Sequence, residues 1–340
     1  MTPFLLEIIR EPQTGNALTL FDAEYDSDRN IVSGYLASKN RSRYPIINGI
    51  PRFVESVPTS TVKSFGDEWN FFNFTDFKVQ WLAHTVQNTF GSTDIFKDKV
   101  IVDAGGGSGS QSKWFSEYGA KHVILLDLSH SVDKVVKKNL AGLKNMDVIQ
   151  CSIDAPPLGK EAINGIVYCH NVLQHTPSVE DTAKALWEVV APGGELVFNC
   201  YGLNDSGLIR SVRFHLVYKN LRRLLSKMPF IVILIYARVM SAFRLIPIFG
   251  DILEKSNVVV QGDVPKIAGE GVFQRLVRRY KAATLNTFDA YGSHEFQHHK
   301  SDFEILRLAI QLQPDSKKIQ NIDDYFSRPQ KIGCALRVFK

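Results

Sequence analysis

A glycine cluster follows a short apolar run in the stretch Val100-Ile-Val-Asp-Ala-Gly-Gly-Gly-Ser-Gly109. Its alternating members Gly105, Gly107 and Gly109 can adopt a positive φ and carry no Cβ, so a ligand can approach the backbone closely. Asp127 ends the next apolar run, where a carboxylate can accept hydrogen bonds from a ribose diol. These residue types at this spacing indicate binding of a nucleoside-type cofactor.

Strands and helices that alternate along the chain must position these residues. A helix is predicted over residues 108–118, with Gly119 as its C-terminal cap. Strands are predicted at residues 100–104, 122–127, 147–151, 165–169, 194–201 and 331–339. This alternation predicts a parallel sheet with helices on both faces, and such sheets bind ligands beyond the carboxyl ends of their strands. Asp103, Asp127, Ser152 and His170 would then line one crevice.

Two motifs together resemble the class I family of methyltransferases that depend on S-adenosylmethionine (SAM). One is the pattern Asp103-x-Gly-x-Gly-x-Gly109, which lacks the G-x-G-x-x-G spacing of dinucleotide-binding folds. The other is the turn Pro192-Gly-Gly194 ahead of the fifth strand. The resemblance implies an α/β fold with a Rossmann-like seven-stranded sheet. It also implies SAM as the cofactor and transferase activity of the EC 2.1.1 type.

The resemblance also assigns roles to residues. The strand-end acid and the glycines would hold the methionine part of SAM, and Asp127 would bind the ribose hydroxyls. Ser152 stands where the family usually has an aspartate for the adenine amine, so its hydroxyl, a water or Asp154 would make that contact. The expected cofactor-binding residues are Asp103, Gly105, Gly107, Gly109, Asp127, Leu128, Ser152, Ile153, His170, Asn171 and Trp69.

Length and composition fit a soluble globular protein of several units. The chain has 340 residues, 22% of them charged, and a net charge of +5, which does not by itself argue for nucleic acid. Its four cysteines form no C-x-x-C pair and suit a reducing cytoplasm. The expected units are a small β-rich domain (1–58), a helical lid (59–98), the SAM-binding core (99–202), a helical cap (203–285) and the rest of the core (286–340).

The first unit resembles a zinc-ribbon-like domain that is fused ahead of many bacterial methyltransferases. By that resemblance the metal-binding cysteines would fall near Glu11, Thr14, Ala37 and Asn40, none of which offers a thiolate. We therefore predict a metal-free domain that folds around its own small core.

The lid and the cap suggest how a substrate is enclosed. Aromatic residues at 65–72 would cover the cofactor, with Phe65 and Trp69 against the sulfonium, or would simply pack in a helix core. The cap contains a basic amphipathic run at 208–226 and seven consecutive apolar or aromatic residues at 230–236, too few to span a bilayer. A buried helix pair over the substrate pocket is the main interpretation. The alternative is a membrane-surface helix or a groove for a lipid-like substrate.

Residues 288–300 are rich in titratable side chains, including Asp289, Tyr291 and three histidines. We interpret the segment as a loop that binds substrate and supplies a base rather than as a metal site, so no bound metal is expected. The predicted candidates for the base are His294, His175, Tyr291 and His298.

The sequence therefore predicts a cytoplasmic SAM-dependent methyltransferase. Its acceptor would be an O or N atom of a small metabolite, sugar or natural-product intermediate, with no nucleic acid partner. Two alternatives stay open. One is an isomerase or cyclase that binds SAM without methylating. The other is an RNA methyltransferase, against which the absence of an N-P-P-Y-like motif counts.

Overall fold

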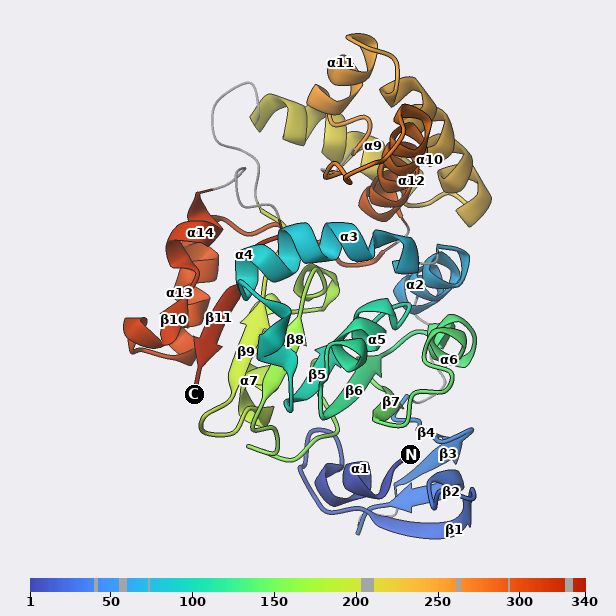
Figure 1. Cartoon of the computed structure of the whole chain (residues 1–340), viewed down its shortest axis with the longest axis vertical. Coiled ribbons are helices and arrows are strands. Elements are labelled where there is room, and N and C mark those ends of the chain that lie inside the picture. The colour runs from blue at the N-terminus through green and yellow to red at the C-terminus, as the bar shows by residue number, and fades with distance from the viewer. Residues whose placement is uncertain are drawn as a thin grey trace.

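A computed structural model describes residues 1–39, 42–54, 60–72, 74–202, 211–260, 264–292, 294–327 and 333–340. Figure 1 shows three layers along the long axis: a small sheet at the N-terminus, a large central sheet with its helices, and a helical cap at the opposite end. The glycine cluster lies in the middle layer, on the side that faces the cap.

The large sheet has seven strands in the order β10-β11-β9-β8-β5-β6-β7. Strands β5 to β9 pair in parallel, whereas β11 runs antiparallel to β9 and β10. The strands are β5 (Val100–Ala104), β6 (His122–Asp127), β7 (Met146–Gln150), β8 (Ile166–Cys169), β9 (Glu195–Phe198), β10 (Ile319–Gln320) and β11 (Leu336–Phe339). The predicted Rossmann-like α/β fold is confirmed. Of the seven strands, only the two-residue β10 was not located from the sequence.

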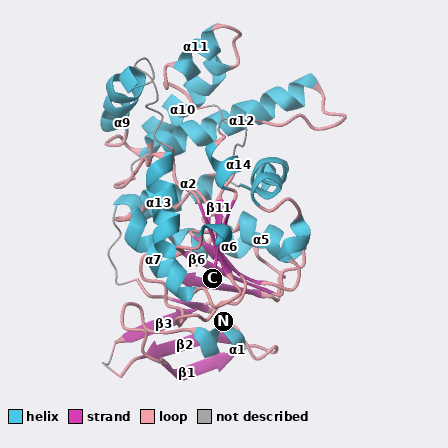
Figure 2. Ribbon diagram, turned by 90° about the vertical axis from the view of Figure 1, so that its left-hand side faces the viewer, coloured by secondary structure: helices cyan, strands magenta, loops and turns pink. Residues whose placement is uncertain are grey.

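Helices cover both faces of this sheet, with α13 and α7 on one side and α5 on the other (Figure 2). The central strands are therefore buried on both faces and read as continuous apolar runs. Ser301 caps α13 and exchanges hydrogen bonds with Glu304, and this capping box fixes the start of the helix. These helices are α5 (Ser110–Glu117), α6 (Val135–Asn139), α7 (Val179–Val189), α13 (Asp302–Leu312) and α14 (Ile322–Phe326).

The N-terminal unit is an antiparallel sheet with one helix. It comprises α1 (Pro3–Ile8), β1 (Thr19–Tyr25), β2 (Ile31–Ala37), β3 (Arg43–Ile47) and β4 (Ile50–Pro51). Its buried residues Leu5, Ile31 and Leu36 belong to the same hydrophobic cluster as Val102 and Ile124 of the large sheet. The unit therefore shares a core with the large sheet and does not fold around a separate one, contrary to the expectation.

A hydrogen bond joins two of the four positions where the resemblance would place zinc ligands, Glu11 and Thr14. The carboxylate of Glu11 accepts from the Thr14 hydroxyl at 2.6 Å, from Asn16 at 3.2 Å and from the Tyr44 hydroxyl at 3.3 Å. Ala37 ends β2, and Asn40 lies outside the described residues.

The lid helices cross the upper end of the large sheet (Figure 1). They are α2 (Ser60–Phe71), α3 (Lys78–Gln80), a π-helical turn (Trp81–Val86) and α4 (Gln87–Thr89). Trp81 is buried against Trp114 and Phe115 of α5, with ring centroids 5.0 and 5.6 Å apart. This aromatic packing fixes the lid over the sheet. Helix α2, at the start of the lid, lies above the glycine cluster.

The cap consists of a π-helical turn (Arg213–Tyr218), α9 (Lys219–Leu225), α10 (Phe230–Arg244), α11 (Phe249–Lys255) and α12 (Val272–Tyr291). One face of α10, with Ile233, Leu234 and Ala237, is buried in a cluster that includes Phe288 of α12. The other face, with Ile231 and Ile235, is exposed. The apolar run is therefore only half buried, which corrects the prediction of a buried helix pair. Within the described residues, no helix is long and apolar enough to cross a membrane.

Helix α12 also changes the expected boundary between cap and core. It continues through residue 285 to Tyr291, so the predicted junction falls inside one helix. The end of α12 therefore carries part of the segment that the sequence analysis interpreted as a loop. Its last turns reach the carboxyl ends of the strands.

Candidate active site

The glycine turn joins β5 to α5 and has the backbone conformation that its sequence predicts. Gly105, Gly107 and Gly109 have φ angles of 82°, 56° and 76°. A Cβ at Gly107 would lie 2.9 Å from the Trp69 indole, and one at Gly105 would lie 2.5 Å from the Val172 side chain. Trp69 therefore packs on the turn from the lid, and the turn tolerates no side chain at these two positions. The contact of Trp69 with the cofactor stays a prediction.

Asp127 at the end of β6 braces this turn. Its Oδ2 accepts from the Gly107 amide at 2.8 Å, and its Oδ1 accepts from the amide and the hydroxyl of Ser129 at 2.8 and 2.6 Å. Burial raises the pKa of Asp127, and the hydrogen bonds from Ser129 and Gly107 partly offset this rise. The carboxylate is fixed beside the turn, where it has the chemistry to accept hydrogen bonds from a ribose.

Asp103 ends β5 beneath the turn and is buried. Its Oδ2 accepts from the Ser112 hydroxyl of α5 at 2.5 Å. Burial raises the pKa of Asp103 to about 7, although the Ser112 hydrogen bond lowers it. Asp103 therefore ties the strand to the helix that follows the turn.

We expect Asp103 to make the protein less stable as the pH rises. Its carboxyl has a pKa of about 7 in the folded chain against 3.8 ordinarily, so the folded state retains the proton between these values. Unfolding free energy should fall through this window and level off above pH 7. Between pH 5 and pH 8, the unfolding free energy of the wild-type protein should fall by about 2 kcal/mol more than that of Asp103→Asn. Urea unfolding at several pH values measures this difference, and parallel curves would contradict it.

The expected adenine side lies at the ends of β6 and β7. Leu128 follows Asp127, and its carbonyl accepts from the Gln150 amide at 3.2 Å. Ser152 is partly buried, and Ile153 is buried in the main core cluster. These positions agree with the expected crevice, and their contacts with adenine stay predictions.

One pocket connects the glycine turn with the lid and the cap. Residues 105–107 form one wall, and His170 and Asn171 after β8 form another. Trp69 of α2 and the C-terminal half of α12 close it from above. Asn171 has a positive φ of 58°, and its amide donates to Asn199 Oδ1 at 2.6 Å. His170 Nε2 lies 3.0 Å from the Gly333 carbonyl.

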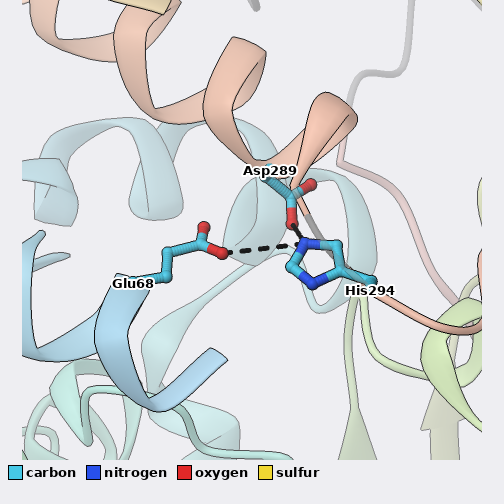
Figure 3. Close-up of side chains that lie close together, drawn as sticks. All are labelled: Glu68, Asp289 and His294. Atoms are coloured by element: carbon cyan, nitrogen blue, oxygen red, sulfur yellow. Dashed lines mark ion pairs between the residues drawn. The ribbon is translucent and has the colours of Figure 1, made fainter. Parts of the chain in front are cut away.

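The same pocket is lined by three further titratable side chains, namely Glu68 of α2, Tyr201 after β9 and Asp289 of α12. Behind them lie His175 and His294. His294 Nε2 is 3.6 Å from Asp289 Oδ1 and 3.7 Å from Glu68 Oε2. Dashed lines in Figure 3 mark these two ion pairs. His175 Nε2 is 3.9 Å from Asp289 Oδ1. We call Glu68, Asp289, His175 and His294 the acceptor cluster.

The surroundings orient the acceptor cluster. Asp289 Oδ2 accepts from the Tyr201 hydroxyl at 2.5 Å, which leaves Oδ1 toward the histidines. His175 Nδ1 lies 3.2 Å from the Phe296 carbonyl, which favours the tautomer with a lone pair on Nε2. The Phe65 ring stacks on the His294 ring with centroids 3.9 Å apart. Phe65 therefore packs against the histidines, whereas Trp69 covers the turn.

Burial gives the members of the cluster different charges. Burial and the nearby charge of Asp289 raise the pKa of Glu68 well above its ordinary value. Burial also opposes ionisation of Asp289, but the neighbouring imidazoles outweigh it and lower its pKa. Burial lowers the pKa of His175 to about 3, although the Asp289 charge opposes this. The pocket therefore presents one ionised carboxylate, one neutral carboxyl group and a neutral imidazole.

The structure does not bring the other two predicted base candidates to the pocket. Tyr291 is fully buried in the cap cluster, and its hydroxyl donates to the Asn257 carbonyl. His298 Nε2 lies 3.0 Å from the Thr176 carbonyl. Glu68 and Tyr201 were not among the predicted site residues, and Asp289 was predicted only as part of the substrate-binding segment 288–300. A prediction that the helix continues to residue 291 would have revealed Asp289. Residues two apart face different sides of a helix, so Asp289 and Tyr291 cannot both face the same pocket.

Comparison with known proteins agrees with this geometry. Residues 102–198 match the family model described as a methyltransferase domain. These residues are a methyltransferase domain. The strand order around the glycine turn, the positive φ angles and the fixed Asp127 carboxylate fit the binding of SAM, and the domain match supports SAM as its cofactor.

The domain has curated relatives that match over part of their length. The chain is 24% identical to the ubiquinone biosynthesis O-methyltransferase of Erwinia tasmaniensis over 136 residues, 40% of this chain and 53% of that protein. It is 32% identical to the tRNA 5-carboxymethoxyuridine methyltransferase of Escherichia coli over 111 residues, 30% of this chain and 41% of that protein. The matches thus span about half or less of these relatives.

A solved SAM-dependent methyltransferase from Mesorhizobium loti is also similar. It is 22% identical, with a TM-score of 0.31, and the match covers 36% of this chain and 53% of that chain. Residues 1–98, which include the lid, lie outside the matched domain, and so does the cap.

Proposed function

We propose that the chain is a SAM-dependent methyltransferase that acts on an O or N atom of a small metabolite, sugar or natural-product intermediate. The observation that carries the proposal is a single pocket that is lined by the glycine turn on one side and by Glu68, Tyr201 and Asp289 on the other. A methyl donor and a polar acceptor would meet there beneath α2 and α12.

When bound, SAM supplies a methyl group on a positively charged sulfur. The glycine turn and Asp127 would fix the cofactor, and Trp69 would keep water from the turn. Because transfer is an in-line displacement, holding donor and acceptor in position is the main contribution of the protein.

The acceptor cluster would bind the acceptor and receive its proton. Asp289 Oδ1 lines the pocket and can accept a hydrogen bond from an acceptor hydroxyl or amine. The proton would pass through Asp289 to the Nε2 lone pair of His175, 3.9 Å away. A hydroxyl that gains a methyl group becomes a strongly acidic oxonium, so even a weak base such as His175 can take the proton.

The experiment that tests this proposal is the release of S-adenosylhomocysteine. The purified protein is incubated with SAM that carries a labelled methyl group and with fractions of a small-molecule extract. We expect equal amounts of S-adenosylhomocysteine and a labelled product in at least one fraction. A product that is formed without S-adenosylhomocysteine would instead favour the isomerase or cyclase alternative, in which SAM is not consumed.

An RNA methyltransferase is the second candidate, because one relative is named for a modified tRNA nucleoside. Transfer of label to total RNA, and not to small molecules, would favour it. The enclosure of the pocket by Trp69 and α12 supports a small acceptor instead.

A further inference from the structure

The acceptor cluster contains buried polar atoms that form no hydrogen bond with the described part of the chain. Both carboxyl oxygens of Glu68 and both ring nitrogens of His294 are buried, and none of these atoms has a hydrogen-bond partner among the described residues. The side chains of Glu68 and His294 are fully buried. Native proteins rarely leave buried polar atoms unpaired, so these atoms indicate a missing ligand.

We infer that Glu68, Asp289 and His294 bind one divalent metal ion beside the acceptor. Each residue offers a ligand atom, and the three atoms lie within 4.8 Å of one another. Atoms at this spacing leave room for an ion about 2 to 2.5 Å from each, which is the range for divalent ions bound by oxygen and nitrogen. The inference deepens the proposed function and depends on it for the role of the ion.

Charge and orientation both favour a cation. Glu68 would release its proton when the ion binds, so that Glu68 and Asp289 together balance a doubly charged ion in a buried site. The His294 imidazole adds a nitrogen ligand. Tyr201 holds the outer oxygen of Asp289 and thereby aims the inner oxygen at the cluster. Such outer hydrogen bonds are typical of metal-binding carboxylates. The backbone carbonyl of His294 accepts from Arg222 at 3.0 Å, which positions the histidine in its turn.

The donor set indicates the class of metal. One imidazole with two carboxylates suits Mn²⁺, Fe²⁺ or Zn²⁺ better than an ion that prefers only oxygen or only sulfur. Since Glu68 and Asp289 line the pocket, an ion between them would face the acceptor. It would polarise an acceptor hydroxyl and make its proton easier to lose.

Calorimetric titration of the chelator-treated full-length chain with Mn²⁺ alone tests the inference. We expect one ion per chain, bound at least tenfold more weakly by Glu68→Gln and by His294→Gln. Asp67→Asn is the matched control, because Asp67 is the neighbouring acidic residue on α2 and pairs with Lys63. It should bind Mn²⁺ like the wild-type protein.

Unfolding curves and binding of S-adenosylhomocysteine show whether the variants are folded. Absence of saturable Mn²⁺ binding in the wild-type protein, or equal binding by all three variants, would overturn the metal site. Methyl transfer that persists at full rate in chelator would also overturn it, yet leave the proposed function standing. Conversely, a chain that binds Mn²⁺ but not S-adenosylhomocysteine would contradict the proposed function.

A separate surface carries a second inference. Of the 22 large hydrophobic side chains that are exposed in the described part of the chain, 15 belong to residues 212–273. We call these 15 side chains the apolar cap surface. Exposed fractions reach 81% at Val272, 78% at Phe273 and 77% at Ile248. Their concentration in one helical unit, rather than over the whole chain, favours an interaction surface there.

The charge of the cap indicates what covers this surface. Residues 203–285 carry 14 basic and 5 acidic side chains, whereas the rest of the chain has 26 basic and 30 acidic ones. Exposed aliphatic and aromatic side chains among basic residues match the interface of an anionic bilayer. We infer that the cap docks on an anionic lipid surface. Binding of RNA would use the basic residues of the cap but would give no reason for its exposed aliphatic side chains.

Vesicle flotation tests this second inference. We expect the protein to float with vesicles of phosphatidylglycerol and phosphatidylcholine but not with phosphatidylcholine alone. The double variant Val272→Ser, Phe273→Ser should lose at least half of the bound fraction. Phe303→Ser is the control, since Phe303 is 84% exposed but lies on α13, outside the cap. No flotation, an equal loss in the control, or dimerisation through the cap without vesicle binding would overturn the inference.

Discussion

Replacing Asp289 with asparagine should lower methyl transfer at least 100-fold while binding of S-adenosylhomocysteine changes less than threefold. Asp289 is the ionised group in the pocket wall, and it connects the acceptor to His175 and His294. Loss of a group that transfers a proton costs roughly 10²- to 10⁴-fold in rate. The rate is measured as formation of S-adenosylhomocysteine with an extract fraction that supports transfer in the wild-type protein.

The control for this prediction is Asp302→Asn, which changes an exposed aspartate in the first turn of α13. Its rate should match the wild-type rate within twofold. His175→Ala should resemble Asp289→Asn, because both remove the same proton path. If Asp289→Asn kept most of its activity, the acceptor would have to bind away from the cluster.

Replacing Asp127 with alanine should weaken binding of S-adenosylhomocysteine by about 1 to 3 kcal/mol, roughly 5- to 150-fold. The carboxylate would lose its contacts with the ribose hydroxyls, and the Gly107 amide would lose its partner. Calorimetry measures the change directly.

An analogue without the ribose hydroxyls separates these two effects. The wild-type protein should bind the analogue much more weakly than S-adenosylhomocysteine. Asp127→Ala should bind the two compounds about equally, because the variant has no carboxylate to contact the hydroxyls. If the variant discriminated as strongly as the wild-type protein, Asp127 would only brace the turn.

The cofactor side of the site was accessible from sequence because its parts lie close together in the chain. Gly105, Gly107 and Asp127 fall within one strand-turn-helix-strand unit, where apolar runs and glycines mark each boundary. The hydrogen bond from Gly107 to Asp127 follows from two parallel strands that end side by side. Local pattern and strand topology together were enough here.

The acceptor side could not be predicted in the same way. Glu68 and His294 meet across more than two hundred residues, and nothing in the sequence around Glu68 distinguishes it from its acidic neighbour Asp67. The segment at 288–300 looked like a loop because its polar residues hide the end of α12. Once the helix is known to reach Tyr291, Asp289 faces the pocket and Tyr291 faces the cap core.

In the cap, the structure differs from the sequence-based prediction in how much of an apolar helix is buried. Seven apolar residues in a row predict burial, yet a single helix can bury only one face against its neighbour. Ile233 and Leu234 pack on the α12 side, and Ile231 and Ile235 are left outside. Sequence alone cannot show how many sides of such a helix have a partner.

A crystal structure of the chain with S-adenosylhomocysteine tests the central claim most directly, namely that cofactor and acceptor share one pocket between the glycine turn and the acceptor cluster. We predict that the ribose hydroxyls lie within hydrogen-bond distance of Asp127 and that the sulfur faces Asp289 and Glu68. A cofactor whose ribose lies away from Asp127, or whose sulfur points away from the cluster, would contradict it.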